Sequence, residues 1–131
     1  MIYMFDTNVI SYLIRGSSIA LKNRFQSENP NNFAISAVVY SEILYGIRKN
    51  AGDKVAKKIL AFLENMRLVD FGADAAVIYA EIRTELEKSG TPIDNMDLLI
   101  AAAAMAGNAI LVSHNTKHFS KIKGLRLEDW Y

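Results

Sequence analysis

The first eight residues, Met1-Ile-Tyr-Met-Phe-Asp-Thr-Asn8, decide how the rest of the chain is interpreted. The apolar run at residues 2–5 stops abruptly at Asp6, which predicts a short buried strand followed at once by the start of a helix. Similar apolar runs predict further strands at residues 33–35, 67–71 and 109–113. The segments between them predict helices at residues 9–14, 19–26, 37–49, 53–65, 74–88 and 95–106.

Strands that alternate with helices predict an α/β fold, because parallel strands need a crossover connection, which is usually a helix. Such a sheet is mainly parallel and twisted, and helices cover both of its faces. The chain has 131 residues, 51% of them hydrophobic, and shows no internal repeat, linker or low-complexity segment. We therefore expect a single domain that spans residues 1–131.

Composition excludes several classes of chemistry. The chain contains no cysteine, which rules out disulfides, cysteine-ligated zinc and a thiol nucleophile. Its 15 basic and 14 acidic side chains nearly cancel, so a nucleic-acid site would need local clustering of positive charge. The apolar stretch at residues 98–107 is far shorter than the roughly 20 residues of a membrane span, and residues 1–8 do not have a signal-peptide pattern. We expect a cytoplasmic protein with no membrane contact.

Asp6 and Glu42 are candidates for chemistry because of where the pattern places them. Asp6 follows the first strand, and open parallel sheets bind ligands at the carboxyl ends of their strands. The alternative is that Asp6 only caps the next helix. Glu42 has largely apolar neighbours three and four positions away, and a buried carboxylate needs a cation or hydrogen bonds. Alternatively, its helix is turned so that Glu42 faces water.

Asp97 is the third candidate, and it begins a helix that is apolar on nearly all sides. Capping is again the alternative, with Asp94 as the N-cap and Asp97 as its partner three residues later. Three carboxylates directed at one sheet edge would repel one another unless a cation neutralised them. Oxygen ligands without cysteine favour Mg²⁺ or Mn²⁺, ions that commonly act on phosphates.

Four blocks of sequence, in their order and spacing, resemble a PIN domain. They are Asp6-Thr7-Asn8, Ser36 with Glu42 six residues later, Thr91-Pro92-Ile93 with Asp97-Leu98-Leu99-Ile100-Ala101-Ala102, and Leu111-Val112-Ser113-His114-Asn115. Within that superfamily the chain is similar to the VapC toxins of bacterial type II toxin–antitoxin systems, over essentially its whole length. The resemblance implies a three-layer PIN-like fold and a Mg²⁺- or Mn²⁺-dependent endoribonuclease that hydrolyses structured RNA such as tRNA.

The same resemblance implies roles for particular residues. Asp6, Glu42 and Asp97 match the acidic positions that hold the metal ion and are catalytic in the family. The same comparison implies four supporting polar positions. The first is a polar residue shortly after the first acid, and the second is usually Ser or Thr. Many members have a fourth acid at the third position, and the fourth is a loop position that is commonly small. In this chain they are Asn8, Ser113, Asn115 and Asp94.

The resemblance also implies partners: a VapB-like cognate antitoxin whose C-terminal tail covers the active site, DNA only indirectly through that antitoxin, and a second copy in a homodimer.

For RNA, Arg48 and Lys49 share the predicted helix of Glu42, and Tyr45 on the same helix is a candidate to stack on a base. The alternative is that these side chains form a solvated helix face. His114 and His118 are interpreted as surface residues.

Two other functions are also compatible with the sequence. Asn115 in place of an acid allows a non-catalytic PIN-like module that binds RNA or an antitoxin. An aspartate-nucleophile phosphatase also begins with a strand ending in Asp, but its chemistry usually needs an acid two residues later, where this chain has Asn8.

Overall fold

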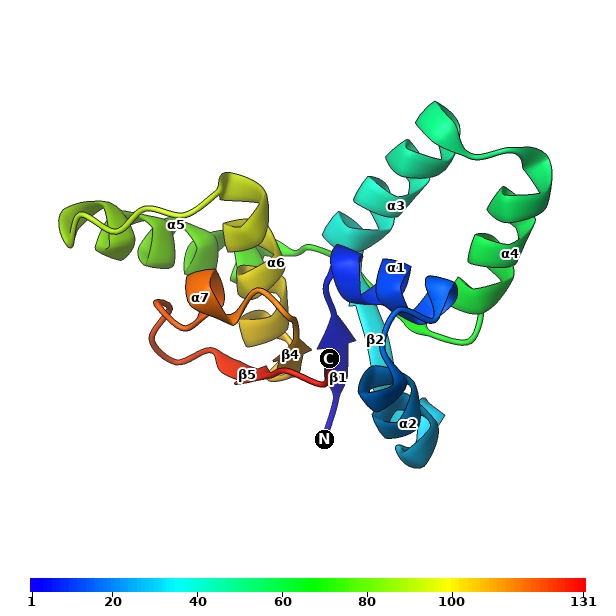
Figure 1. Ribbon diagram of the computed structural model, residues 1–131. Coiled ribbons are helices and arrows are strands. Elements are labelled where there is room, and N and C mark those ends of the chain that lie inside the picture. Colours follow the sequence, from blue (N-terminus) through cyan, green and yellow to red (C-terminus); the bar gives the residue numbers. More distant parts are fainter.

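A computed structural model describes all residues 1–131, and its ribbon shows a central sheet with helices around it (Figure 1). The five strands are β1 (Tyr3–Phe5), β2 (Phe33–Ser36), β3 (Arg67–Val69), β4 (Ile110–Val112) and β5 (Arg126–Glu128). The helices are α1 (Thr7–Arg15), α2 (Ile19–Ser27), α3 (Ala37–Asn50), α4 (Asp53–Leu63), α5 (Ala73–Lys88), α6 (Asn95–Ala106) and α7 (Thr116–Phe119), and a 3-10 turn covers Pro30–Asn32. None of the helices combines the length and apolar character needed to cross a membrane.

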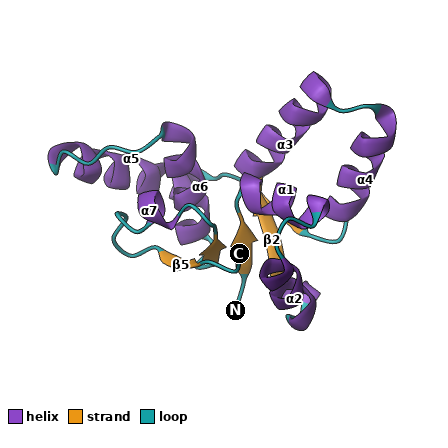
Figure 2. Ribbon diagram, in the orientation of Figure 1, coloured by secondary structure: helices purple, strands orange, loops and turns teal.

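The predicted α/β architecture is confirmed. The strands lie in the order β3-β2-β1-β4-β5, and every neighbouring pair is parallel. Figure 2 shows how the helices surround the strands. Sequence reasoning missed β5, because Arg126-Leu127-Glu128 is an edge strand with charged residues on both sides of a single leucine. It also extended β3 to residue 71, two residues beyond its observed end.

The alternation of side chains along β1 shows how the two faces are covered. Phe5 packs against Phe25 of α2 and against Trp130, with ring centroids 5.8 and 5.4 Å away. Met4 points to the opposite face, where its sulfur lies close to Gly107 at the end of α6. Because consecutive residues of a strand face opposite sides, one short strand contributes to both layers of the core. Phe62 of α4 stacks on Phe25 and so belongs to the first layer.

The strand order creates a crevice at one edge of the sheet. From β1 the chain builds outward through β2 to β3, then returns through α5 and α6 to place β4 on the other side of β1. Right-handed crossovers in opposite directions put the connecting helices on opposite faces, so the connections leaving β1 and β4 separate at their carboxyl ends. Asp6 follows β1 and Ser113 follows β4, and both therefore lie at this crevice.

Candidate active site

Asp6 caps α1 with one carboxylate oxygen and directs the other at the crevice. Its Oδ1 accepts a hydrogen bond from the backbone N–H of Val9 at 2.8 Å, so it caps α1. Its Oδ2 accepts a hydrogen bond from Ser113 Oγ at 2.5 Å, across the crevice. Only 5% of the residue is exposed, and this burial is the main reason why the pKa of Asp6 is raised. The hydrogen bonds from Ser113 and Val9 lower that pKa, whereas the charges of Asp97 and Glu42 raise it further.

Glu42 lies on α3 and is half-buried. Its Oε1 accepts a hydrogen bond from Thr7 Oγ1 at 2.6 Å. Thr7 immediately follows Asp6, so this bond connects the second acid to the first strand end. The alternative in which Glu42 turns fully to water is therefore wrong. Sequence reasoning gave Thr7 no role of its own, although it stood inside the Asp6-Thr7-Asn8 triplet.

Asp97 lies in the first turn of α6, and 23% of its side chain is exposed. Its Oδ2 is 3.7 Å from Nδ1 of His118. Burial raises the pKa of Asp97 most, followed by the charge of Asp94; His118 lowers it, and Glu42 raises it. The cap of α6 belongs to Asp94, whose Oδ2 accepts from the backbone N–H of Met96 at 3.1 Å. Asp97 makes no return bond to the backbone of Asp94, so the capping-box interpretation of Asp97 is wrong.

Asp6 and Asp97 are linked by a continuous series of contacts around the crevice. From Asp6 the series runs through Ser113 to the backbone N–H of Asn115, which donates to Ser113 Oγ at 2.9 Å. The Asn115 side-chain nitrogen lies 3.0 Å from Nδ1 of His118, which also faces Asp97. His118 was interpreted as a surface residue. Its side chain is 44% exposed, but its position at the rim of the site beside Asp97 gives it a role that spacing did not reveal.

The donor chemistry of the site fits a hard divalent cation. All three acids offer oxygen, and burial together with mutual repulsion raises the pKa of Asp6 and Asp97, which a cation would reverse. Each acid is directed at a partner of its own, and no group of three or more His, Asp or Glu side chains forms a closed metal-binding set. Asn8 is exposed and makes no side-chain hydrogen bond. The residues thus supply ligands that would have to draw together around an ion.

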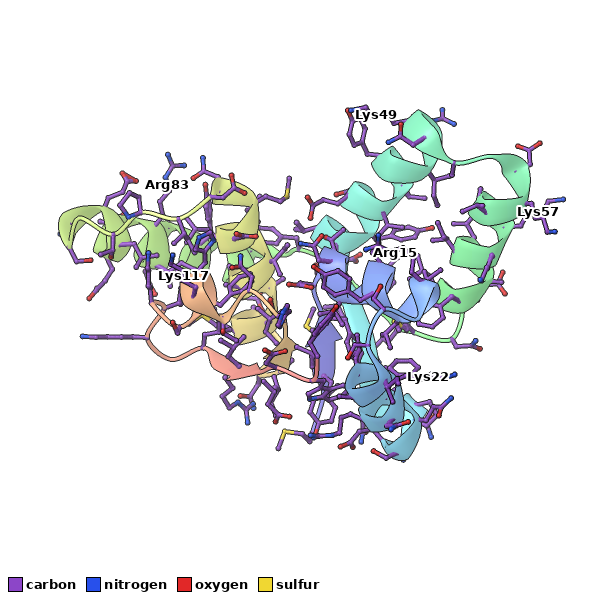
Figure 3. All side chains as sticks on the ribbon, viewed as in Figure 1. Arg15, Lys22, Lys49, Lys57, Arg83 and Lys117 are labelled. Atoms are coloured by element: carbon purple, nitrogen blue, oxygen red, sulfur yellow. The ribbon has the colours of Figure 1, made fainter.

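The predicted RNA-binding residues lie further along α3. Tyr45 is 66% exposed, and Lys49 Nζ lies 5.8 Å from the centre of its ring. Arg48 is six positions beyond Glu42, a distance of about 9 Å along a helix. Figure 3 shows Lys49 at the far end of α3 and Lys57 on α4, well apart from each other. The basic side chains of α3 and α4 therefore do not form one compact patch at the acids.

A groove opens beside the acids, between α1, α3 and α4. Its volume is about 380 Å³. Thr7 and Glu42 belong to its wall, and the other lining residues are mostly apolar: Ile10, Ser11, Ile14, Arg15, Ile43, Gly46, Ile47, Asn50, Ala51, Val55 and Ile59. The groove thus connects the acidic crevice to an unfilled apolar surface.

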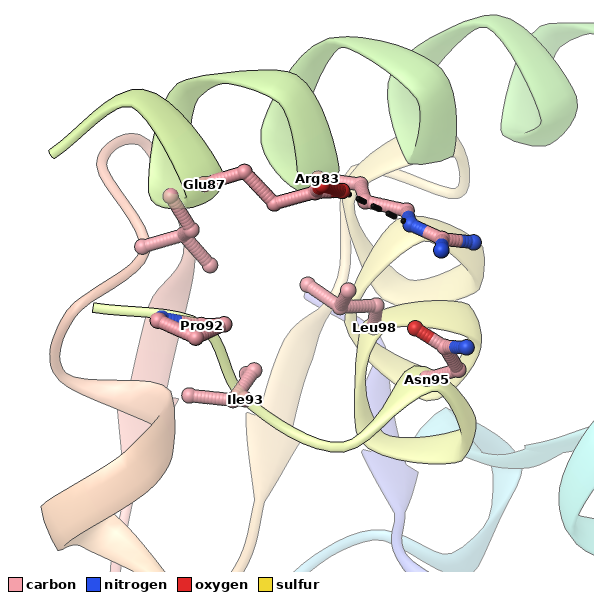
Figure 4. A pocket seen from close by; sticks show the side chains of 7 residues that line it. Arg83, Glu87, Pro92, Ile93, Asn95 and Leu98 are labelled. Atoms are coloured by element: carbon pink, nitrogen blue, oxygen red, sulfur yellow. Dashed lines mark hydrogen bonds and ion pairs between the residues drawn. The ribbon is translucent and has the colours of Figure 1, made fainter. Parts of the chain in front are cut away.

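A second cavity, of about 300 Å³, lies between α5 and the loop before α6 (Figure 4). Arg83 and Glu87 of α5 form an ion pair on its wall, with Arg83 Nε 3.0 Å from Glu87 Oε1. None of the three acids lines this cavity. It therefore has no part in the candidate active site.

Comparison with known proteins identifies the family to which this fold belongs. The PIN-domain family matches residues 3–125. The chain is 42% identical to "Ribonuclease VapC2" of Rickettsia felis, over 99% of this chain and 98% of that protein. It is 33% identical to the "tRNA(fMet)-specific endonuclease VapC" of Shigella flexneri, over 98% and 97%. The chain belongs to the PIN-domain family, among the VapC ribonucleases.

Solved structures of VapC proteins agree with this assignment. The VapBC2 complex of Rickettsia felis, bound to a DNA fragment from its promoter, contains a chain with a TM-score of 0.91 and 41% identity, and the match covers 100% of both chains. The DNA-bound VapBC complex of Salmonella typhimurium gives a TM-score of 0.92 at 30% identity, over 100% of this chain and 99% of that one. Both solved structures are VapBC complexes, in agreement with the predicted family of toxin–antitoxin proteins. The comparisons favour the enzyme over both the non-catalytic module and the phosphatase.

Proposed function

We propose that this VapC-family ribonuclease cuts RNA at a metal site held by Asp6, Glu42 and Asp97, with Mg²⁺ or Mn²⁺ as the ion. Nucleases of the PIN family generally use a divalent metal ion. The observation that carries the proposal is geometric: Asp6 is buried at the β1–β4 crevice and bonded to Ser113, and Glu42 is bonded to Thr7, the residue after Asp6. The charges of Asp97 and Glu42 add to the burial that raises the pKa of Asp6. Such a cluster is costly for the folded chain unless it binds a cation.

The ion would supply charge neutralisation and an activated water for in-line attack on a phosphodiester. The chain's own residues orient the ligands. Ser113 and the Val9 N–H hold the two oxygens of Asp6, and each oxygen keeps a second lone pair for a ligand. Thr7 holds Glu42 in the same way. We expect products with a 5′ phosphate and a 3′ hydroxyl, with water as the nucleophile and no covalent intermediate on the protein.

We propose tRNA as the substrate class, with the initiator tRNA as the first candidate. The support is the 33% identity to the endonuclease of Shigella flexneri, whose name specifies tRNA(fMet). The cytoplasm, where tRNA is abundant, is the compartment that this substrate implies. The absence of cysteine is consistent with a reducing compartment.

We further propose that the antitoxin occupies the groove between α1, α3 and α4. An apolar segment of the partner would fill the cavity of about 380 Å³, and a basic side chain at its end would reach Glu42. Such an occupant would cover the acids and prevent RNA from entering. DNA contact would then remain a property of the antitoxin. For the homodimer, the exposed apolar side chains of Leu68 on β3 and Val77 on α5 are candidates for the surface that a second copy covers.

The test is cleavage of purified initiator tRNA by antitoxin-free protein, with 5′ ends mapped by sequencing. We expect cleavage with Mg²⁺ or Mn²⁺, none with EDTA, and none for Asp6→Asn at any metal concentration. Asp53→Asn, which removes an exposed acid at the start of α4, is the matched control and should cleave normally. Cleavage that persists in EDTA or in Asp6→Asn overturns the proposed site.

A further inference from the structure

A group of three aromatic rings lies beside the acids, on residues for which the cleavage reaction has no use. The rings belong to Tyr12 on α1, to His114 directly after Ser113, and to Tyr131. Ser113 donates its hydrogen bond to Asp6, and α1 begins directly after Asp6. Tyr12 is therefore connected to Asp6 through α1, and His114 is connected to it through Ser113 and its hydrogen bond.

The geometry of the group is that of a small stacked platform. The rings of His114 and Tyr131 are stacked, with centroids 4.2 Å apart and planes 19° from parallel. Tyr12 stands across both, with its centroid 5.1 Å from that of Tyr131 and 6.4 Å from that of His114. The Arg15 guanidinium, one helical turn further along α1, lies 5.7 Å from the Tyr12 ring centre. Figure 3 marks the position of Arg15 on α1.

Two of these rings are exposed but held in place. The His114 side chain is 49% exposed, and Tyr131 is 44% exposed. Asp129 restrains both, since its Oδ2 lies 2.9 Å from His114 Nδ1 and its Oδ1 accepts from the Tyr131 backbone N–H at 3.0 Å. Two exposed rings with restrained positions lose little conformational freedom when a third flat ring stacks on them.

Anchoring the end of the sheet does not account for the group. That role is filled by Trp130, which is 5% exposed and packs against Tyr3 and Phe5. Arg24 covers the indole at 4.7 Å, and Trp130 Nε1 donates to Glu128 Oε1 at 2.9 Å. Packing alone thus gives no reason to leave His114 and Tyr131 nearly half exposed.

We propose that Tyr12, His114 and Tyr131 form a stacking site for one unpaired base of the RNA substrate, next to the phosphate that is cut, with Arg15 contacting the neighbouring phosphate. Exposed aromatic rings beside a cation match the chemistry of single-stranded RNA, whose bases stack on aromatic rings while its phosphates pair with basic side chains. The inference rests on the proposed ribonuclease site. Such a platform favours an RNA that is cleaved in a loop or single-stranded segment, because a base that is paired in a duplex cannot stack on it.

The test separates binding from cleavage by using Asp6→Asn as the background. The probes are hairpin RNAs from the initiator tRNA, each with 2-aminopurine, a fluorescent adenine analogue, at one loop position. We expect one position at which binding quenches the fluorescence. In Asp6→Asn/Tyr131→Leu the quenching should disappear and Kd should rise roughly 5- to 100-fold, the range for loss of one stacked base. Asp6→Asn/Tyr131→Phe, which keeps the ring, should restore both.

Tyr79→Leu is the matched control, because Tyr79 lies on α5 and, like Tyr12, has an arginine beside its ring. In the Asp6→Asn background it should leave quenching and Kd unchanged. The platform is overturned if Tyr131→Leu binds every hairpin as tightly as the background, if Tyr79→Leu abolishes the quenching instead, or if Tyr131→Leu weakens only antitoxin binding. Failure of the proposed cleavage site is recognised separately, by residual cleavage in Asp6→Asn.

Discussion

Replacing Asp6 by Asn should stabilise the metal-free protein while it abolishes cleavage. Asparagine has nearly the same shape as aspartate, so its oxygen can still accept from the Val9 N–H and its amide can face Ser113 Oγ. The charge is lost, and the contact with Ser113 is kept as a hydrogen bond in which the amide N–H donates to Oγ. That charge is buried and repelled by Asp97 and Glu42, which together raise the pKa of Asp6. Removing it therefore removes a cost that the metal-free fold otherwise carries.

Asp6→Ala is the variant with which the stability of Asp6→Asn is compared. It removes the same charge, but it also removes the cap of α1, which costs about 1 kcal/mol, and leaves the buried Ser113 hydroxyl without any side-chain partner at this position, which costs about 1 kcal/mol more. The Asn variant should therefore exceed the Ala variant by about 2 kcal/mol in free energy of unfolding. For a domain of this size, that difference corresponds to roughly 7 °C in Tm.

The pH dependence follows from the direction of the shift. A raised pKa means that the folded state binds the Asp6 proton more tightly than the unfolded state, so charging the group costs stability. The cost is fully present above the raised folded pKa, falls as pH drops through it, and is absent below the ordinary value of 3.8. The advantage of Asp6→Asn over the wild type should thus be largest near neutral pH and shrink on acidification.

The assay is urea and thermal unfolding in EDTA, at pH 7 and in steps down to pH 4, for wild type, Asp6→Asn and Asp6→Ala. Added Mg²⁺ should raise the Tm of the wild type more than that of either variant. Equal stability of the Asn and Ala variants would refute the structural reasoning about the cap. An advantage of Asp6→Asn that grows toward low pH would refute the reasoning about the buried charge.

Three further changes test other parts of the structure. Trp130→Ala should cost about 3–5 kcal/mol of unfolding free energy, because the indole is 5% exposed and packs on two rings of β1; chemical denaturation measures this, and a loss below 1 kcal/mol would contradict it. Ser36→Ala should cost about 1 kcal/mol, because it removes the side-chain cap of α3, while metal-dependent cleavage survives at a temperature well below Tm. Val55→Asp, at an exposed position of the groove, should weaken antitoxin binding at least 10-fold in calorimetry and leave antitoxin-free cleavage intact; unchanged affinity would place the antitoxin elsewhere.

The sequence by itself determined the class of fold and most of its elements. Apolar runs too short for a core helix and bounded by polar residues predicted four of the five strands. The long amphipathic or apolar segments predicted six helices, all of which the structure contains. These patterns are readable because burial on two faces requires an unbroken apolar run. The strand β5, with its Arg126-Leu127-Glu128, has a single apolar residue and therefore no apolar run, and it was missed.

The sequence also predicted Asp6, Glu42 and Asp97 as candidate site residues, because each is a carboxylate at the end of a strand or on an apolar helix. The sequence could not distinguish a helix cap from a metal ligand. A cap depends on residues that are neighbours in the chain, whereas a metal site depends on residues that are far apart in it. Only the tertiary structure brought Ser113 to Asp6, 107 positions away in the chain, and Thr7 to Glu42, 35 positions away. It also placed His118 beside Asp97 and gathered the Tyr12, His114 and Tyr131 rings. Strand order decides such contacts, because it is the arrangement of β1 beside β4 that brings the ends of distant segments to one crevice.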